Sequence, residues 1–157
     1  PEPVSRMEAL GCEIGNHSYD HTDLTTLSAE DVSSQLSATD QEIQDLAGHA
    51  ATVVRPPYGA INDTVSSVVG RPMILWSVDT LDWETQNVDT TVQNVMDNAQ
   101  DGAVILMHDI FKESVDAAEI FIPQLIEQGY ELVTIEELAK AKGVQLQAGV
   151  SYGAMTD

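Results

Sequence analysis

The chain has 157 residues, of which 43% are hydrophobic, and this is enough for one well-buried core. Its formal net charge of −20 argues against nucleic acid and against membrane insertion or binding to anionic membranes, because those partners need basic surfaces or long apolar runs. A single cysteine excludes an internal disulfide. The excess of acid predicts a solubilising surface, with adaptation to salt or a preference for neutral or cationic polymers as alternatives.

Capping signals and apolar periodicity predict six helices. Ser28 is a natural N-cap with Asp31 three residues later, and Gly48 follows the apolar stripe that begins there. Thr134 and Glu137 form a capping box. The expected helices lie at the start of the chain, from Ser28 to Gly48, after Asn62, after Asp89, from about Ser114 to Gln128, and from Thr134 to Gly143.

Short apolar runs between these helices predict strands. The most strand-like run, 103–107, is apolar throughout, which is typical of a strand buried on both faces. The remaining tail, 144–157, has weak periodicity and is expected to pack on the outside or to fray. The expected strands are residues 12–16, 51–54, 73–78, 103–107 and 131–134.

The alternation of strand and helix predicts an α/β fold with a parallel sheet covered by helices. An open doubly wound sheet and a β/α barrel both satisfy this pattern. One domain is expected, because no linker, repeat or low-complexity segment interrupts the alternation.

Four polar clusters follow four of the expected strands directly. In parallel β/α folds the carboxyl ends of the strands converge on one face, where active sites are built. The clusters are 17–21 (HSYDH), 55–59 (RPPYG), 79–83 (DTLDW) and 108–109 (HD).

The first two clusters each have a functional and a plain interpretation. His17 and His21 are four residues apart, so both imidazoles can bind one metal ion, or they are simply two exposed loop histidines. Arg55 either favours the ionised form of a neighbouring carboxylate or is an ordinary surface cation that ends a strand.

The other two clusters have the same ambiguity. Asp79 and Asp82 form either part of a site or a solvated turn at a helix start. His108 follows five apolar residues, which places an imidazole either at the mouth of the sheet or among satisfied core groups.

Taken together and in this order, the four clusters resemble motifs two to five of the polysaccharide deacetylases, the catalytic domain of carbohydrate esterase family 4. The resemblance extends over nearly the whole chain, from residues 11–16 to residues 134–135. The family fold that it implies is a distorted (β/α)7 barrel similar to a TIM barrel.

The family's first motif, a segment like Thr-Phe-Asp-Asp, has no counterpart in the chain. The resemblance therefore implies that this motif and the first two barrel strands precede residue 1. Residues 1–143 would form the major C-terminal part of one catalytic domain, followed by the tail 144–157. The missing N-terminal part is expected as a partner, supplied as a second chain.

The resemblance also implies roles for the first two clusters. His17 and His21 would hold one divalent metal, Zn²⁺ by preference with Co²⁺ or Ni²⁺ as alternatives. The third ligand and the general base would be aspartates of the missing motif, with Arg55 keeping the base ionised. The backbone N–H of Tyr58 would hold the oxyanion, in a geometry that Pro57 helps to fix.

In the remaining clusters, His108 would be the general acid, and Asp79 would set its tautomer and keep it protonated. Trp83 and Leu106, with Pro57, would contact the substrate around the acetyl methyl group, although core packing is the alternative for Trp83.

The implied function is metal-dependent hydrolysis of N- or O-acetyl groups on an acetylated carbohydrate such as chitin, peptidoglycan or acetylxylan, which releases acetate. The alternatives are an amidohydrolase that acts on a non-sugar amide and a non-catalytic carbohydrate-binding relative. A secreted or cell-surface location is expected from the family.

Overall fold

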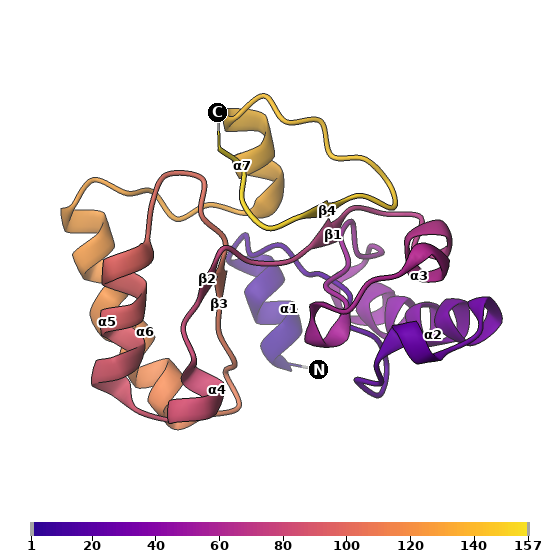
Figure 1. Ribbon diagram of the computed structural model, residues 1–157, viewed down its shortest axis with the longest axis horizontal. Helices are drawn as coiled ribbons and strands as arrows, with labels where there is room; N and C mark the ends of the chain where they lie inside the picture. Colours follow the sequence, from indigo (N-terminus) through magenta and orange to yellow (C-terminus); the bar gives the residue numbers. More distant parts are fainter. Residues whose placement is uncertain (1, 157) are drawn as a thin grey trace. The chain divides into compact units, whose positions relative to one another are not determined.

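A computed structural model describes residues 2–156, and these residues divide into two compact units (Figure 1). The first unit contains residues 2–75 and 134–152, and the second contains residues 76–133 and 153–156. Each unit is described by itself. Within residues 2–156 no helix combines the length and the apolar character that crossing a membrane requires.

Helices account for about half of the first unit, and their ends follow local capping chemistry. The predicted N-caps at Ser28, Asn62 and Thr134 are confirmed, since each side chain accepts a hydrogen bond from a backbone N–H of the first turn. The elements are α1 (Glu2–Ala9), η1 (Leu24–Thr26), α2 (Ala29–Ala47), η2 (Pro57–Gly59), α3 (Asp63–Val68), β1 (Met73–Ile74), α7 (Ile135–Ala141) and β4 (Ser151–Tyr152).

The core of the first unit lies where α2 and α3 pack against the strand region (Figure 1). Val32 and Leu36 lie four residues apart on one face of α2 and are both buried. Val65 of α3 and Met73 of β1 complete the same cluster with Val54. This packing holds the chain segments that carry the first two polar clusters.

The expected strands 12–16 and 51–54 are much shorter than predicted. Each contributes a single residue to parallel pairing, in the order Asn16, Val54 and Met73. The neighbouring residues of these runs follow the same direction but do not form a continuous ladder. The parallel arrangement is confirmed, and the predicted strand lengths are wrong.

The second unit contains a helix pair beside a short parallel sheet. Val95 of α5 (Val88–Asn98) packs on α6 (Lys112–Glu127) through Ala117, Phe121 and Leu125, which recur at four-residue spacing on one helix face. The elements are β2 (Val78–Asp79), α4 (Asp82–Thr85), α5 (Val88–Asn98), β3 (Ile105–Leu106) and α6 (Lys112–Glu127).

Two sequence predictions need correction within this region. Asn87, not Asp89, is the N-cap of α5, because its side chain accepts from the backbone N–H of Thr90. The expected strand 73–78 is two strands, because the chain changes partner within it. Residues up to 75 pair with the β4 region, whereas the backbone N–H groups of residues 77 and 78 donate to Val104.

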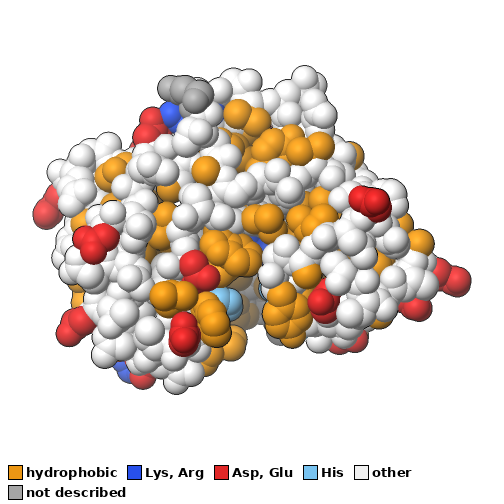
Figure 2. Space-filling view, viewed as in Figure 1, with side chains coloured by type: hydrophobic (Ala, Val, Ile, Leu, Met, Phe, Trp, Pro, Cys, Tyr) orange, Lys and Arg blue, Asp and Glu red, His pale blue; other side chains and the backbone are white. Residues whose placement is uncertain are grey.

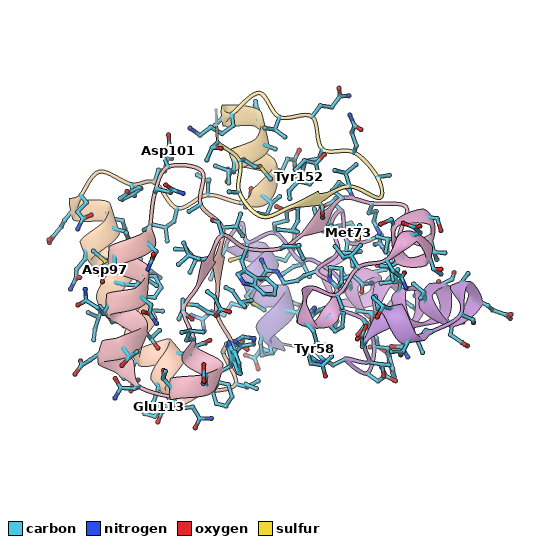
Figure 3. All side chains as sticks on the ribbon, viewed as in Figure 1. Tyr58, Met73, Asp97, Asp101, Glu113 and Tyr152 are labelled. Carbon is cyan, nitrogen blue, oxygen red and sulfur yellow. The ribbon has the colours of Figure 1, made fainter. Side chains whose placement is uncertain are left out.

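Of the two expectations for the tail, packing on the outside and fraying, fraying is wrong. Ser151 and Tyr152 form β4 and pair in parallel with Met73 and Ile74 of β1. Met73 and Tyr152 are labelled in Figure 3. In the second unit Met155 is buried and donates its backbone N–H to Gly102. The expected strand 131–134, in contrast, is not a strand, and Leu132 and Val133 are exposed.

The α/β class is confirmed, because helices alternate with strands and both named sheets are parallel. Their strand orders are β1–β4 and β2–β3. The predicted barrel is not closed by residues 2–156, since these sheets have two strands each.

Candidate active site

Backbone strain is concentrated in the polar clusters that the sequence singled out. Five described residues other than glycine have φ in the left-handed region, which costs about 1–3 kcal/mol per residue. Four of them are Ser18 and His21 in the first cluster, Tyr58 in the second and Leu81 in the third. Only Gln86 lies outside the clusters. Strain of this kind gathers where a fixed geometry serves a function.

His17 and His21 lie together in the first unit, in the loop that follows Asn16. Their ring centroids are 4.9 Å apart and the rings are nearly perpendicular. The Nδ1 atom of His17 lies 2.5 Å from the carbonyl oxygen of Arg55. Because a carbonyl only accepts, Nδ1 carries the proton and a neutral ring has its lone pair on Nε2. This is the arrangement that metal-binding histidines adopt.

The Arg55 side chain is anchored on the backbone of the segment that follows it. Its Nε donates to the carbonyl oxygen of Ile74 at 3.1 Å, and its Nη2 donates to that of Leu75 at 3.2 Å. Burial lowers the pKa of the Arg55 guanidinium, which nevertheless stays charged. These contacts fix a cation in the first unit, within the second polar cluster.

Tyr58 occupies the middle of the η2 turn in a left-handed conformation, with φ of 60°. The turn is closed by hydrogen bonds from Gly59 to Pro56 and from Ala60 to Pro57. Neither of these two bonds uses the backbone N–H of Tyr58. Its ring contacts His21 edge-on, with ring centroids 4.8 Å apart, and the residue is 69% exposed. The turn therefore presents a backbone donor beside the histidine pair.

In the second unit, His108 is held by Asp82. The Oδ1 atom of Asp82 lies 2.9 Å from Nδ1 of His108, and Oδ2 accepts from the His108 backbone N–H at 2.7 Å. Ser114 and the Trp83 backbone N–H also donate to this carboxylate, at 2.6 and 2.9 Å. The His108 side chain is 34% exposed, whereas that of Asp82 is 1% exposed.

The charge of Asp82 is stabilised by these donors. Burial acts to raise the pKa of Asp82, but the hydrogen bonds from Ser114 and His108 outweigh it and lower the pKa below its ordinary value. An ionised Asp82 requires the proton on Nδ1 of His108. In the protonated ring, Nε2 then carries the second proton, which is the one available for transfer.

The predicted pairing of Asp79 with His108 is wrong. The Oδ1 atom of Asp79 instead accepts from the backbone N–H of Leu81 at 3.0 Å and from the Trp83 indole at 3.4 Å. The strand register explains the difference. Asp79 pairs with Leu106, so His108 lies two residues past the partner of Asp79, and it bonds to a residue further along the chain, Asp82.

The three predicted substrate-contact residues lie in different surroundings. Trp83 is 48% exposed, so core packing does not account for its position. Leu106 and Pro57 are buried. Trp83 and Leu106 belong to the second unit, and Pro57 to the first.

The structure thus groups the predicted residues into two clusters. His17, His21, Arg55 and Tyr58 lie in the first unit, and Asp79, Trp83 and His108 lie in the second. The sequence did not predict that Asp82 holds His108 or that Ser114 donates to Asp82. It shows two acids three residues apart, Asp79 and Asp82, and only the fold distinguishes the one that bonds to His108.

The two imidazoles of His17 and His21 suit a divalent transition metal. Imidazole nitrogen is a ligand that Zn²⁺, Co²⁺ and Ni²⁺ all accept, and the fixed tautomer of His17 provides the lone pair. Within residues 2–156 no group of three His, Cys, Asp or Glu side chains is close enough to hold a metal ion. The cluster fits two positions of a metal site.

Comparison with known proteins agrees with the motifs. The family model described as polysaccharide deacetylase matches residues 1–71. The solved structure of the peptidoglycan deacetylase PdaC from Bacillus subtilis is 44% identical, with a TM-score of 0.89 over 91% of this chain and 71% of that one. The chain belongs to the polysaccharide deacetylase family.

Two further relatives show the breadth of this polysaccharide deacetylase family. The chain is 41% identical over its whole length to the peptidoglycan-N-acetylglucosamine deacetylase PgdA of Listeria monocytogenes. It is 28% identical to a family 4 acetyl xylan esterase from Clostridium thermocellum, solved with a cobalt ion, with a TM-score of 0.93 over 99% of this chain and 78% of that one. The chain spans about a third of the full length of PdaC and PgdA, 30% and 33%.

Proposed function

We propose that the protein removes acetyl groups from an acetylated polysaccharide in a metal-dependent hydrolysis that releases acetate. The observation that carries this proposal is the buried Asp82, which holds His108 through two hydrogen bonds and leaves the ring partly exposed. A carbohydrate-binding module has no use for an acid of this design. The polysaccharide deacetylases similar to this chain give the reaction class.

His17 and His21 would hold the metal, for which we propose Zn²⁺. When bound, the metal supplies Lewis-acid chemistry to the acetyl carbonyl and to water. A third ligand and a general base are also needed, and we assign both to the part of the full-length protein that lies outside this chain. Support comes from the two-histidine geometry and from the cobalt ion in the acetyl xylan esterase structure.

Arg55 and Tyr58 have electrostatic roles in this proposal. Arg55, fixed by the carbonyls of Ile74 and Leu75, favours the ionised form of the general base. The Tyr58 backbone N–H donates to the oxyanion that develops on the acetyl carbonyl. Its left-handed turn, beside His21, sets the direction of that donor before substrate binds.

His108 completes the reaction as the general acid. A water oxygen bonds to the acetyl carbon while the general base takes a proton from that water. The bond between the acetyl carbon and the sugar nitrogen or oxygen then breaks, and its electron pair stays on the leaving atom. His108 donates the Nε2 proton to that atom, so the products are acetate and a free amine or hydroxyl. Asp82 holds the ring in the tautomer that this transfer requires.

The substrate contacts follow from exposure and position. The half-exposed Trp83 offers an aromatic surface to the sugar or the acetyl methyl group, and its indole is oriented by Asp79. Leu106 of the second unit and Pro57 of the first are each proposed as apolar contacts of the substrate. The accompanying fold is a distorted (β/α)7 barrel to which these residues contribute the strands described above.

Among polysaccharides we propose peptidoglycan as the substrate, because PdaC and PgdA are both named for it. Peptidoglycan lies outside the cytoplasmic membrane, so a secreted or cell-surface location accompanies this proposal. Acidic side chains spread over the visible face of the protein, which is consistent with a substrate that is not a polyanion such as nucleic acid (Figure 2).

The test is an acetate-release assay on the full-length protein with peptidoglycan, acetylated chitooligosaccharide and acetylxylan. Release from peptidoglycan, abolished by chelation and reduced about a hundredfold or more in His108→Ala, supports the proposal. Release from the other glycans alone would move the substrate assignment. Hydrolysis confined to non-sugar amides would instead make the protein an amidohydrolase of another kind.

A further inference from the structure

A chain of hydrogen bonds links α2 and the α3–β1 connection to the loop that carries the two histidines. We propose that Arg71 and Asp40, acting through Asn16, are positioning residues that hold this loop in its metal-binding conformation. The inference rests on the proposed function for its purpose. Its geometry lies entirely within the first unit.

Asn16 is the buried centre of this network. It is fully buried, and its backbone pairs on both sides, with Val53 and with Arg55. Its side-chain Nδ2 donates to the carbonyl of Leu36 at 2.9 Å and to Oδ1 of Asp40 at 2.8 Å. Its Oδ1 accepts from the backbone N–H of Ser18 at 2.9 Å. Both N–H groups and the oxygen of the Asn16 side-chain amide are therefore hydrogen-bonded.

Arg71 anchors the far end of the network. Its Nη1 and Nη2 donate to the two carboxylate oxygens of Asp40 at 2.7 and 2.8 Å, which is the two-pronged geometry of a strong arginine–carboxylate pair. Nη1 also donates to the carbonyl oxygen of Ala51. Both partners are largely buried, with side-chain exposures of 20% and 25%. The contact therefore fixes the position of Asp40 on α2.

Asp40 decides the orientation of the Asn16 amide. A carboxylate only accepts, so Nδ2 must point toward α2 and Oδ1 toward the Ser18 N–H. Reversing the amide would place two acceptors against each other on one side and two donors on the other. The Leu36 carbonyl favours the same orientation, so loss of Asp40 weakens it without removing it.

The loop needs this support because its backbone is strained. Ser18 and His21 have φ of 66° and 62°, although neither is glycine. The Ser18 N–H is held by Asn16, and the Ser18 hydroxyl accepts from the His21 N–H at 3.0 Å. A displacement at Asn16 therefore passes through Ser18 to His21. The two rings would then lose the mutual placement that lets them share one ion.

The test measures the loop in two ways on the full-length protein. Affinity for Co²⁺ is obtained from its visible absorption in competition with a chelator, and amide exchange of Ser18 and His21 is followed in metal-free protein. The variants are Asp40→Ala, Arg71→Ala and the double variant. Arg71→Lys, which keeps the charge but loses the two-pronged contact, covers a failure of Arg71→Ala to fold.

Two matched controls separate positioning from general destabilisation. Asp45→Ala removes a carboxylate from the same helix, but Asp45 is exposed and accepts from Gln41. Val69→Ala opens a cavity in the core of the same unit and removes no side chain that forms a hydrogen bond of the network. Neither control should change Co²⁺ affinity by more than about twofold, the scatter expected of a neutral site.

We expect each network variant to weaken Co²⁺ binding by about tenfold, the lower end of what supporting residues contribute to a metal site. The double variant should lose about as much as either single one, because both act through Asn16. Exchange at Ser18 and His21 should quicken in the network variants only. Wild-type affinity and exchange in Asp40→Ala and Arg71→Ala would overturn the inference, as would an equal loss in Val69→Ala.

Failure of the proposed function is distinguishable. If the wild-type protein binds no Co²⁺, the metal site is refuted, while the exchange rates in metal-free protein still decide whether the network holds the loop. If the wild-type protein binds Co²⁺ and the network variants bind it equally well, only the positioning inference fails.

Discussion

Replacing Asp82 with asparagine is the sharpest perturbation of the group around His108, because the shape of the side chain is retained while its charge is lost. The carboxylate accepts four hydrogen bonds, two from His108 and one each from Trp83 and Ser114. An amide offers one oxygen, so at most two of these donors keep an acceptor. The Ser114 hydroxyl can rotate to accept from the new NH₂ group, but at least one N–H then faces another donor.

The stability cost follows from this count. Hydrogen bonds to a charged group contribute about 1.5–3 kcal/mol each, and water cannot replace them at a side chain that is 1% exposed. Allowing for the Ser114 rotation, Asp82→Asn should lower the free energy of unfolding by about 2–4 kcal/mol at neutral pH. Urea denaturation of the full-length protein measures this difference.

The pH dependence of the free energy of unfolding shows independently that the ionised form of Asp82 stabilises the fold. The pKa of Asp82 is lowered in the folded protein, so its ionised form stabilises the fold above the unfolded pKa of about 3.9. That stabilisation is lost as pH falls through the lower folded value. The gap between wild type and Asp82→Asn should therefore be constant above about pH 5 and should narrow toward pH 3.

The same substitution should affect catalysis through His108. Without the carboxylate the His108 ring loses the acceptor that fixes its tautomer and its orientation. Turnover should fall by about tenfold to a hundredfold, less than for removal of the acid itself.

Asp79→Asn is the matched control. Its amide oxygen can keep both bonds that Asp79 accepts, from Leu81 and from the Trp83 indole, so the stability change should stay below about 1 kcal/mol. Turnover should fall less than in Asp82→Asn. A larger effect at Asp79 than at Asp82, or an Asp82→Asn stability gap that is unchanged at pH 3, would refute the assigned pairing.

Three further substitutions test packing and electrostatics. Gly102→Ala should lower the free energy of unfolding by at least about 2 kcal/mol in urea denaturation, because φ is +83° and the new Cβ would lie 2.0 Å from the backbone carbonyl oxygen of Met155. Gly129→Ala, with φ of +92° and open space around the new Cβ, isolates the backbone strain and should cost less. Phe121→Ala should lower the free energy of unfolding by about 3–5 kcal/mol, because it opens a cavity in the core of the second unit. The control Ile120→Ala, at an exposed position of the same helix, should cost less than about 1 kcal/mol. Equal costs would contradict this packing. Arg55→Lys should lower kcat/KM by about tenfold or more, since lysine cannot repeat the fixed two-carbonyl contact, and unchanged kinetics would remove Arg55 from the site.

Helix boundaries were predictable because capping is local. Ser28, Asn62 and Thr134 each satisfy a backbone donor within three residues, so a single sequence contains the whole interaction. Asn87 shows the limit. Asn87 and Asp89 both lie near the start of α5, and only the hydrogen bond that Asn87 accepts from the backbone N–H of Thr90 distinguishes them.

Strands were less predictable, because pairing depends on residues distant in the sequence. The apolar run 73–78 contains no internal sign that its first residues pair with the tail and its last ones with Val104. The tail has weak periodicity, yet β4 pairs with β1 and Met155 is buried. Neither contact is encoded within a short window.

The site was predictable at the level of motifs and not at the level of partners. His17, His21 and Tyr58 were brought together as expected, because two loops that follow neighbouring parallel segments lie at the same end. The choice between Asp79 and Asp82 required the register of β2 against β3. The support of the histidine loop by Arg71, more than 50 residues further along the chain, required the fold itself.

Metal-dependent deacetylation is tested most directly by acetate release from peptidoglycan by the full-length protein before chelation, after chelation and after metal is restored. We expect release to stop with the chelator, to return with Zn²⁺ or Co²⁺, and not to return in a His17→Ala/His21→Ala variant that remains folded. Release that persists undiminished after complete metal removal, or in the double-histidine variant, would contradict the central claim.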